Sequence, residues 1–85
     1  MSDEELREKL ADLAHSQWSG WTEYLFEKSI RHPRTGGVTI PHTLVKRWVR
    51  QMRTPYAELS ESEKDSDRKE ADKFLTVLKE YNSGK

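Results

Sequence analysis

The chain has 85 residues, of which 33% are hydrophobic and 35% charged, so it has enough apolar material for one domain with one modest core. Its 15 basic and 15 acidic residues balance, so net charge gives no support to a nucleic-acid-binding or membrane-surface protein. The absence of cysteine excludes disulfides and thiolate metal sites, and no apolar run approaches the roughly 20 residues of a membrane span.

The first predicted helix runs from the N-terminus to about Ile30. Ser2 is suited to cap it, with Glu5 in the second position of a capping box. Gly20 interrupts the helix at a cost of about 0.5–1 kcal/mol relative to alanine, so we expect either a close neighbouring backbone or a bend there. We expect the apolar face of this helix, including Trp18, to form the core. That face consists of Leu6, Leu10, Leu13, Ala14, Trp18, Trp21 and Leu25.

A loop at residues 31–39 is predicted to follow, because it contains a proline and a glycine pair. The end of this segment, near residues 38–40, is β-prone and is expected either to pair in a small ribbon or to lie extended over the core. Pro41 suits the first position of a second helix, because its missing N–H is not needed there. That helix should end near Arg53, since Pro55 disfavours helical geometry in the preceding residue. Its apolar face consists of Leu44, Val45, Trp48, Val49 and Met52.

The second helix also carries a basic row beside Trp48. This row consists of Lys46, Arg47, Arg50 and Arg53. A basic helix after a helix and a turn is typical of proteins that read nucleic acid, whereas the neutral total charge favours a solvated face. Alternatively, Arg50 or Arg53 binds a nucleotide phosphate while Trp21 or Trp48 stacks on the base. All three interpretations are compatible with the residues.

A turn and a third helix complete the predicted fold. Tyr56 and Leu59 are apolar anchors inside the turn, so we expect the turn to pack against the helices. Ser60 with Glu63 indicates a capping box, in which each side chain bonds the other residue's backbone N–H. The third helix should then run to about Tyr81.

The turn and the start of the third helix resemble the ryanodine-receptor repeat domain. The family's pattern P-Y-x-x-L-x-x-x-x-K-x-x-D-R is matched here by Pro55, Tyr56, Leu59, Lys64, Asp67 and Arg68. Upstream, Ala14-His15 followed by Trp18 resembles the A-H-x-x-W of the family's first helix. The middle differs, because a basic helix stands where a typical repeat has a G-W-x-Y-G segment. The chain also resembles small bacteriophage proteins that carry this domain.

The resemblance implies a non-enzymatic binding module. In the channels, paired repeats hold an adenine nucleotide between aromatic rings, so the ligand implied here is a nucleotide-derived small molecule, or else a protein partner. It also implies that a single-copy chain works as a homodimer. The matched Lys64, Asp67 and Arg68 lie within about one helical turn, and we expect them to form a local network that fixes the turn rather than a ligand site.

Nothing in the sequence indicates catalysis, a metal or a cofactor. The histidines His15, His32 and His42 have no H-x-x-x-H spacing, and no G-x-S-x-G or phosphate-loop motif occurs. We therefore expect a protein that is not an enzyme. The alternative, a different kind of function, is a small nucleic-acid-binding accessory protein that uses the basic helix at residues 41–53.

The prediction as a whole is a single all-α domain spanning residues 1–85. It consists of three helices with a packed Pro-Tyr turn, an ordered core at about residues 3–81 and a flexible tail at residues 82–85. Met1 leads into an acidic, polar run rather than a secretory signal, so we expect a cytoplasmic protein. Three tryptophans and their aromatic neighbours are more apolar surface than three short helices can cover, which favours self-association.

Overall fold

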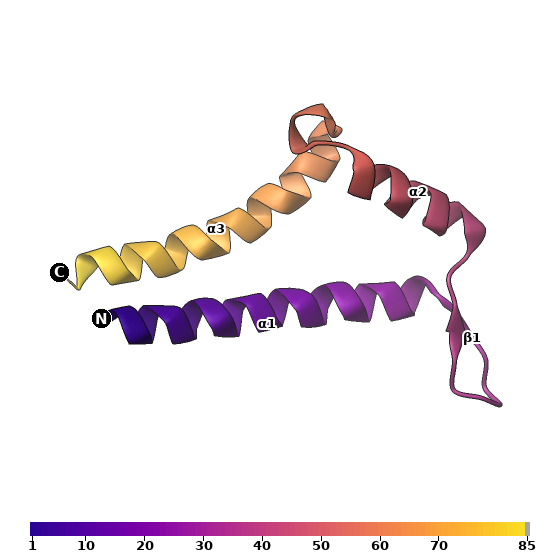
Figure 1. Ribbon diagram of the computed structural model, residues 1–85, viewed down its shortest axis with the longest axis horizontal. Coiled ribbons are helices and arrows are strands. Elements are labelled where there is room, and N and C mark those ends of the chain that lie inside the picture. Colours follow the sequence, from indigo (N-terminus) through magenta and orange to yellow (C-terminus); the bar gives the residue numbers. More distant parts are fainter. Residues whose placement is uncertain (85) are drawn as a thin grey trace.

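The computed structural model describes residues 1–84 and contains three α-helices, as predicted. The elements in chain order are α1 (Asp3–Lys28), β1 (Ile30–Arg31), β2 (Val38–Thr39), α2 (His42–Arg53), the 3₁₀ turn η1 (Tyr56–Glu58) and α3 (Glu61–Ser83). Helices α1 and α3 run side by side with the two ends of the chain close together, and they diverge toward α2 (Figure 1). The fold is therefore an open triangle of helices with the β1–β2 hairpin at one corner.

Helix α1 is continuous through Gly20, so the glycine does not break it. The Ser2 side chain accepts a hydrogen bond from the Glu5 backbone N–H at 3.1 Å, as the predicted cap requires. A Cβ placed on Gly20 would meet nothing within 4 Å, so the expected close approach of another backbone does not occur within this chain. The space over Gly20 belongs to the cavity that the three helices surround.

The segment after α1 is a small antiparallel hairpin rather than a plain loop. Ile30 pairs with Thr39, so the extended segment predicted near residues 38–40 is one of its two strands. Gly36 has a φ of 76°, a backbone conformation that glycine adopts without steric cost. His32 closes the hairpin, because its Nε2 lies 2.6 Å from the Thr39 hydroxyl. The hairpin sets the direction in which the chain enters α2.

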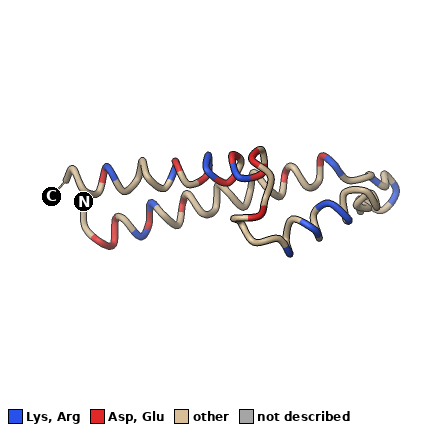
Figure 2. The backbone as a smooth tube through the Cα atoms, turned by 90° about the horizontal axis from the view of Figure 1, so that it is seen from above, with Lys and Arg blue, Asp and Glu red and all other residues tan. Residues whose placement is uncertain are grey.

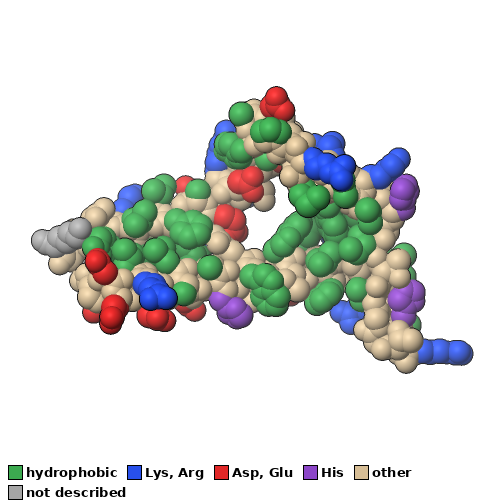
Figure 3. Space-filling view, viewed as in Figure 1, with side chains coloured by type: hydrophobic (Ala, Val, Ile, Leu, Met, Phe, Trp, Pro, Cys, Tyr) green, Lys and Arg blue, Asp and Glu red, His purple; other side chains and the backbone are tan. Residues whose placement is uncertain are grey.

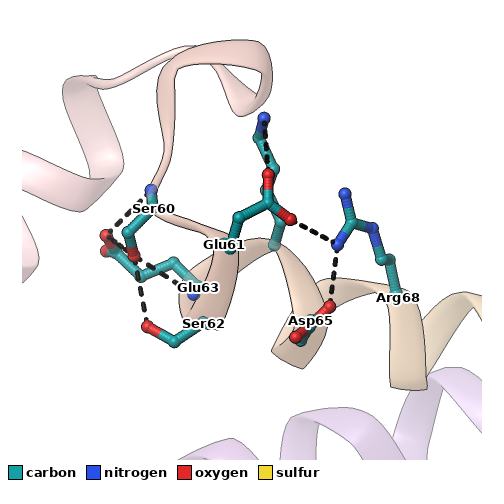
Figure 4. Close-up of polar contacts among 7 residues, drawn as sticks. Ser60, Glu61, Ser62, Glu63, Asp65 and Arg68 are labelled. Carbon is teal, nitrogen blue, oxygen red and sulfur yellow. Dashed lines mark hydrogen bonds and ion pairs between the residues drawn. The ribbon is translucent and has the colours of Figure 1, made fainter.

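Helix α3 begins at the predicted capping box. The Glu63 N–H donates to Ser60 Oγ at 3.3 Å, and the Ser60 N–H donates to Glu63 Oε1 at 3.4 Å (Figure 4). The helix continues to Ser83, two residues past its predicted end at Tyr81. Residue 85, the last of the predicted flexible tail, lies outside the described residues.

Helices α1 and α3 form an antiparallel pair that holds the two ends of the chain together. Lys9 Nζ lies 3.0 Å from Glu80 Oε2, and the Tyr81 hydroxyl donates to Asp3. Ion pairs as exposed as Lys9–Glu80 contribute little, so half-buried side chains carry most of the contact. From their partial burial along the paired stretch, we infer that the interface residues are Leu6, Leu10, Leu13 and Gln17 on α1, and Glu70, Phe74, Val77 and Tyr81 on α3.

None of the described residues is buried within the single chain. The expectation that Trp18 belongs to a core is therefore wrong for one chain, since 63% of Trp18 is exposed, and Trp21 is 55% exposed. The radius of gyration is 17.1 Å, whereas a compact domain of this length has about 12 Å. The physical reason is the open triangle, in which α2 and α3 diverge from α1 instead of closing over it (Figure 1).

The capping box predicts that replacing Ser60 lowers the stability of the folded chain. Ser60→Ala should lower the free energy of unfolding by about 1 kcal/mol, because the first turn of α3 loses the acceptor for its Glu63 N–H. Ser66→Ala is the matched control, as this serine lies in the interior of the same helix with an exposed side chain. Urea unfolding followed by circular dichroism measures both. Equal midpoints for the two variants would contradict the cap.

Candidate ligand-binding site

An open cavity of about 1030 Å³ lies at the centre of the triangle. Figure 3 shows the hollow between the helices and the hydrophobic side chains that gather around it. Its apolar lining consists of Trp21, Tyr24, Trp48, Met52, Leu59, Ala71 and Phe74. Its charged lining consists of Arg47, Glu63, Asp67, Glu70 and Lys73. A mostly apolar wall with a few polar groups is the usual composition of a small-molecule site.

Three aromatic rings form one wall of the cavity. Trp21 and Tyr24, three residues apart on α1, are stacked with their ring centroids 5.4 Å apart and their planes at 15°. Trp48 of α2 meets Trp21 edge-on, at 5.7 Å and 65°. These rings hold α2 beside α1, and about half of Trp21 stays exposed.

Two polar atoms of cavity-lining residues are buried without a hydrogen-bond partner among the described residues. They are the Trp48 indole Nε1, a donor, and the Glu70 carboxylate Oε2, an acceptor. A buried polar group left unpaired costs about 1–3 kcal/mol, so native structures seldom leave one without a partner. The other oxygen of Glu70 accepts from Lys73 at 3.0 Å, an interaction that lowers the pKa of this carboxyl. Glu70 is therefore ionised at neutral pH and can accept.

The basic row of α2 divides between the cavity and the outer surface. Helix α2 carries basic residues and no acidic one, whereas α1 and α3 carry both kinds (Figure 2). Arg47 lines the cavity and lies 3.5 Å from the Tyr24 hydroxyl. Arg50 pairs with Glu63 at 3.1 Å, and neither Arg50 nor Arg53 lines the cavity. The structure thus brings the predicted Trp21 and Trp48 together but places Arg47, not Arg50 or Arg53, beside them.

Lys46 and Arg53 form no ion pair with any described residue. Sequence reasoning missed Tyr24 and Glu70 as site residues. The spacing of Tyr24 from Trp21, one helical turn, is a signal that could have found it. Glu70 had no such signal, since its role depends on where α3 lies relative to α2.

Glu63 links α2 to α3 at the edge of the cavity. The hydroxyl of Ser60 donates to Glu63 Oε1 at 2.7 Å, and Arg50 donates to its other oxygen. Hydrogen bonds from Ser60, Gln51 and Arg50 hold the pKa of Glu63 at about 2, well below its ordinary value of 4.5. One carboxylate thus caps α3 and also receives two side chains of α2.

The residues that match the ryanodine-receptor repeat pattern lie mainly around the start of α3. Lys64 Nζ stands 5.8 Å from the centre of the Tyr56 ring, which ties the turn to the helix, although Tyr56 is still 48% exposed. Arg68 bonds Asp65 at 2.7 Å and Glu61 at 3.0 Å, a pairing that raises the pKa of Arg68 (Figure 4).

The remaining matched residues lie apart from this network. Asp67, expected in the network, lines the cavity instead, together with Leu59. At the other end of the resemblance, His15 stacks on Trp18 with 6.1 Å between the rings, and both side chains are exposed. The matched set therefore has three locations: the start of α3, the cavity and the outside of α1.

We compared the chain with protein-family models, curated proteins and solved structures. No protein-family model, curated protein or solved structure matches this chain.

Among residues 1–84, no three His, Asp or Glu side chains are grouped so that they could hold a metal ion. Nor is any helix of the described chain both long enough and apolar enough to cross a membrane.

The low pKa of Glu63 predicts that the contact between α2 and α3 weakens in acid. Because its pKa in the folded chain is lowered from 4.5 to about 2, its carboxylate stabilises the fold above about pH 4.5, and this stabilisation is lost as the pH falls toward 2. Glu63→Gln should lower the urea midpoint at pH 7 and flatten its dependence on pH between 5 and 2. The matched control is Glu4→Gln, in the first turn of α1, which should keep the wild-type pH dependence. An unchanged pH profile for Glu63→Gln would contradict the link.

Proposed function

We propose that this chain is a non-enzymatic binding module whose central cavity takes a nucleotide-derived small molecule. The observation that carries the proposal is that two residues lining this aromatic-walled cavity, Trp48 and Glu70, each hold a buried polar atom without a hydrogen-bond partner, so a small side-chain movement would offer both atoms to a ligand. Adenine has the complementary hydrogen-bonding groups, because its ring nitrogens can accept from the Trp48 indole and its exocyclic amine can donate to the Glu70 carboxylate. Stacking on an aromatic ring contributes about 1–3 kcal/mol per base in proteins that bind single-stranded nucleic acid.

The charges around the cavity favour a ligand with few phosphate groups. Arg47 is the cation on the aromatic side, where it can pair with one phosphate. The charged cavity-lining residues on α3 are Glu63, Asp67, Glu70 and Lys73, so this side has a net negative charge that would repel a triphosphate. We therefore infer a nucleoside monophosphate or a cyclic monophosphate as the ligand class.

The resemblance to the ryanodine-receptor repeat supports the same ligand class, since that family's paired repeats hold an adenine nucleotide. It also supports a cytoplasmic accessory protein of phage type, located in the host cytoplasm. No nucleophile or acid–base pair is part of the proposal. The cavity residues act by stacking, hydrogen bonding and charge.

The alternative of a nucleic-acid-binding protein uses the basic row Lys46, Arg47, Arg50 and Arg53, of which only Arg50 forms an ion pair with the described residues. The three cations without an ion pair can contact three phosphates at most. A DNA titration at low salt, with Lys46→Gln/Arg53→Gln as comparison, distinguishes the two functions. Tight binding by wild type that the double variant loses would favour nucleic acid over the small-molecule proposal.

Isothermal titration calorimetry with adenosine 5′-monophosphate and with adenosine 3′,5′-cyclic monophosphate tests the proposed site. We expect wild type to bind one of these probes. Trp48→Phe should weaken that binding about fivefold or more, because phenylalanine keeps an aromatic ring but lacks the indole donor. The matched control is Trp18→Phe, which removes an indole that does not line the cavity. Absence of binding for both probes, or an equal loss in the two variants, would overturn the proposal.

A further inference from the structure

The accessible surface of the chain is far larger than a self-sufficient domain of its mass would have. The chain exposes 6998 Å², whereas a folded monomer of 10.0 kDa exposes about 5,200 Å². The excess of about 1,800 Å² falls within the ~1,000–2,500 Å² that each chain buries in an obligate homodimer. The area therefore suits one partner of similar size.

The exposed apolar residues of α1 and α3 form two strips with regular spacing. On α1 the strip consists of Ala11, Ala14 and Trp18, and on α3 it consists of Leu75, Leu78 and Ala71, the last of which also borders the cavity. Each residue of a strip directly follows a residue of the α1–α3 interface along the chain, as Trp18 follows Gln17 and Leu75 follows Phe74. All six are exposed, and Leu75 is exposed to 52%. Steps of three and four keep each strip on one face of its helix.

Both strips lie on the same side of the α1–α3 pair. One step along a helix rotates a side chain by about 100°, in a sense fixed by the chain direction. Because α1 and α3 are antiparallel, equal steps away from their shared interface turn both strips toward the same side. Figure 3 shows hydrophobic side chains gathered over both helices on the face that it displays. We call this two-helix face the outer strip.

We propose that a second copy of this chain packs on the outer strip, so that α1 and α3 of two chains form a four-helix bundle. Antiparallel helix pairs with apolar strips at this spacing are the building units of such bundles. The formal net charge of the chain is zero, so two copies have no overall repulsion to overcome. A two-fold arrangement would set Trp18 and Leu75 of each chain into the shared core.

Closure of the chain on itself does not cover the outer strip. Helix α2 has 12 residues, and its Trp48 already faces the cavity against Trp21. The outer strip points away from the α1–α3 interface, and the short α2 cannot cover both this strip and the cavity. The α1–α3 pair of a second copy has helices long enough to cover the outer strip.

Sedimentation velocity without any nucleotide tests the proposal, so its outcome does not depend on the proposed ligand. At tens of micromolar we expect wild type to sediment with twice the 10.0 kDa mass of one chain. Leu75→Glu and Trp18→Glu should each shift the mass toward one chain, because a charge would enter the bundle core. Phe26→Glu is the matched control, as Phe26 is 47% exposed on α1 and outside the outer strip.

Circular dichroism at the same concentrations shows whether each variant keeps its helices. Loss of helicity that tracks the loss of the double mass supports the proposal, since folding then depends on the second copy. A one-chain mass for wild type would overturn it. The proposal would also be overturned if Leu75→Glu and Trp18→Glu both kept the two-chain mass. The same holds if Phe26→Glu dissociated the dimer as much as they do.

Discussion

The hydrophobic residues of this chain lie on helix faces that cannot all turn toward one another within one molecule. Helix α1 uses one face against α3, a neighbouring face for the outer strip, and its C-terminal half for the aromatic wall of the cavity. Helix α2 is too short to close both open sides. No described residue is buried, so the chain has little core of its own, which is the observation behind the proposed second copy.

Two small contacts fix the position of α2 relative to α1 and α3. The ring contact of Trp48 with Trp21 holds α2 against α1, and Glu63 holds α2 against the capped start of α3. Together they frame the central cavity, whose lining includes Trp48 and Glu70, the two residues with a buried polar atom that lacks a hydrogen-bond partner. The cavity and the outer strip share only Ala71, and we propose different occupants for them, a small ligand and a second chain.

Local signals in the sequence predicted the helices well, because caps and prolines act over three or four residues. Ser60 with Glu63 identified the start of α3, and Pro55 the end of α2. Periodicity identified the apolar face that includes Trp18 but not the element that covers it, and the structure places no element of the same chain there. The choice of Arg47 over Arg50 at the cavity likewise depends on a tertiary contact, since Glu63 of α3 takes up Arg50.

We propose that one chain does not complete its own core and that a second copy completes it. Small-angle X-ray scattering on protein eluting from a sizing column measures mass and shape together, over a range of concentrations. We expect a scattering mass twice the 10.0 kDa of one chain. A one-chain mass with a radius of gyration near the ~12 Å of a compact domain, instead of the 17.1 Å of the open triangle, would contradict it, because the chain would then close without a partner.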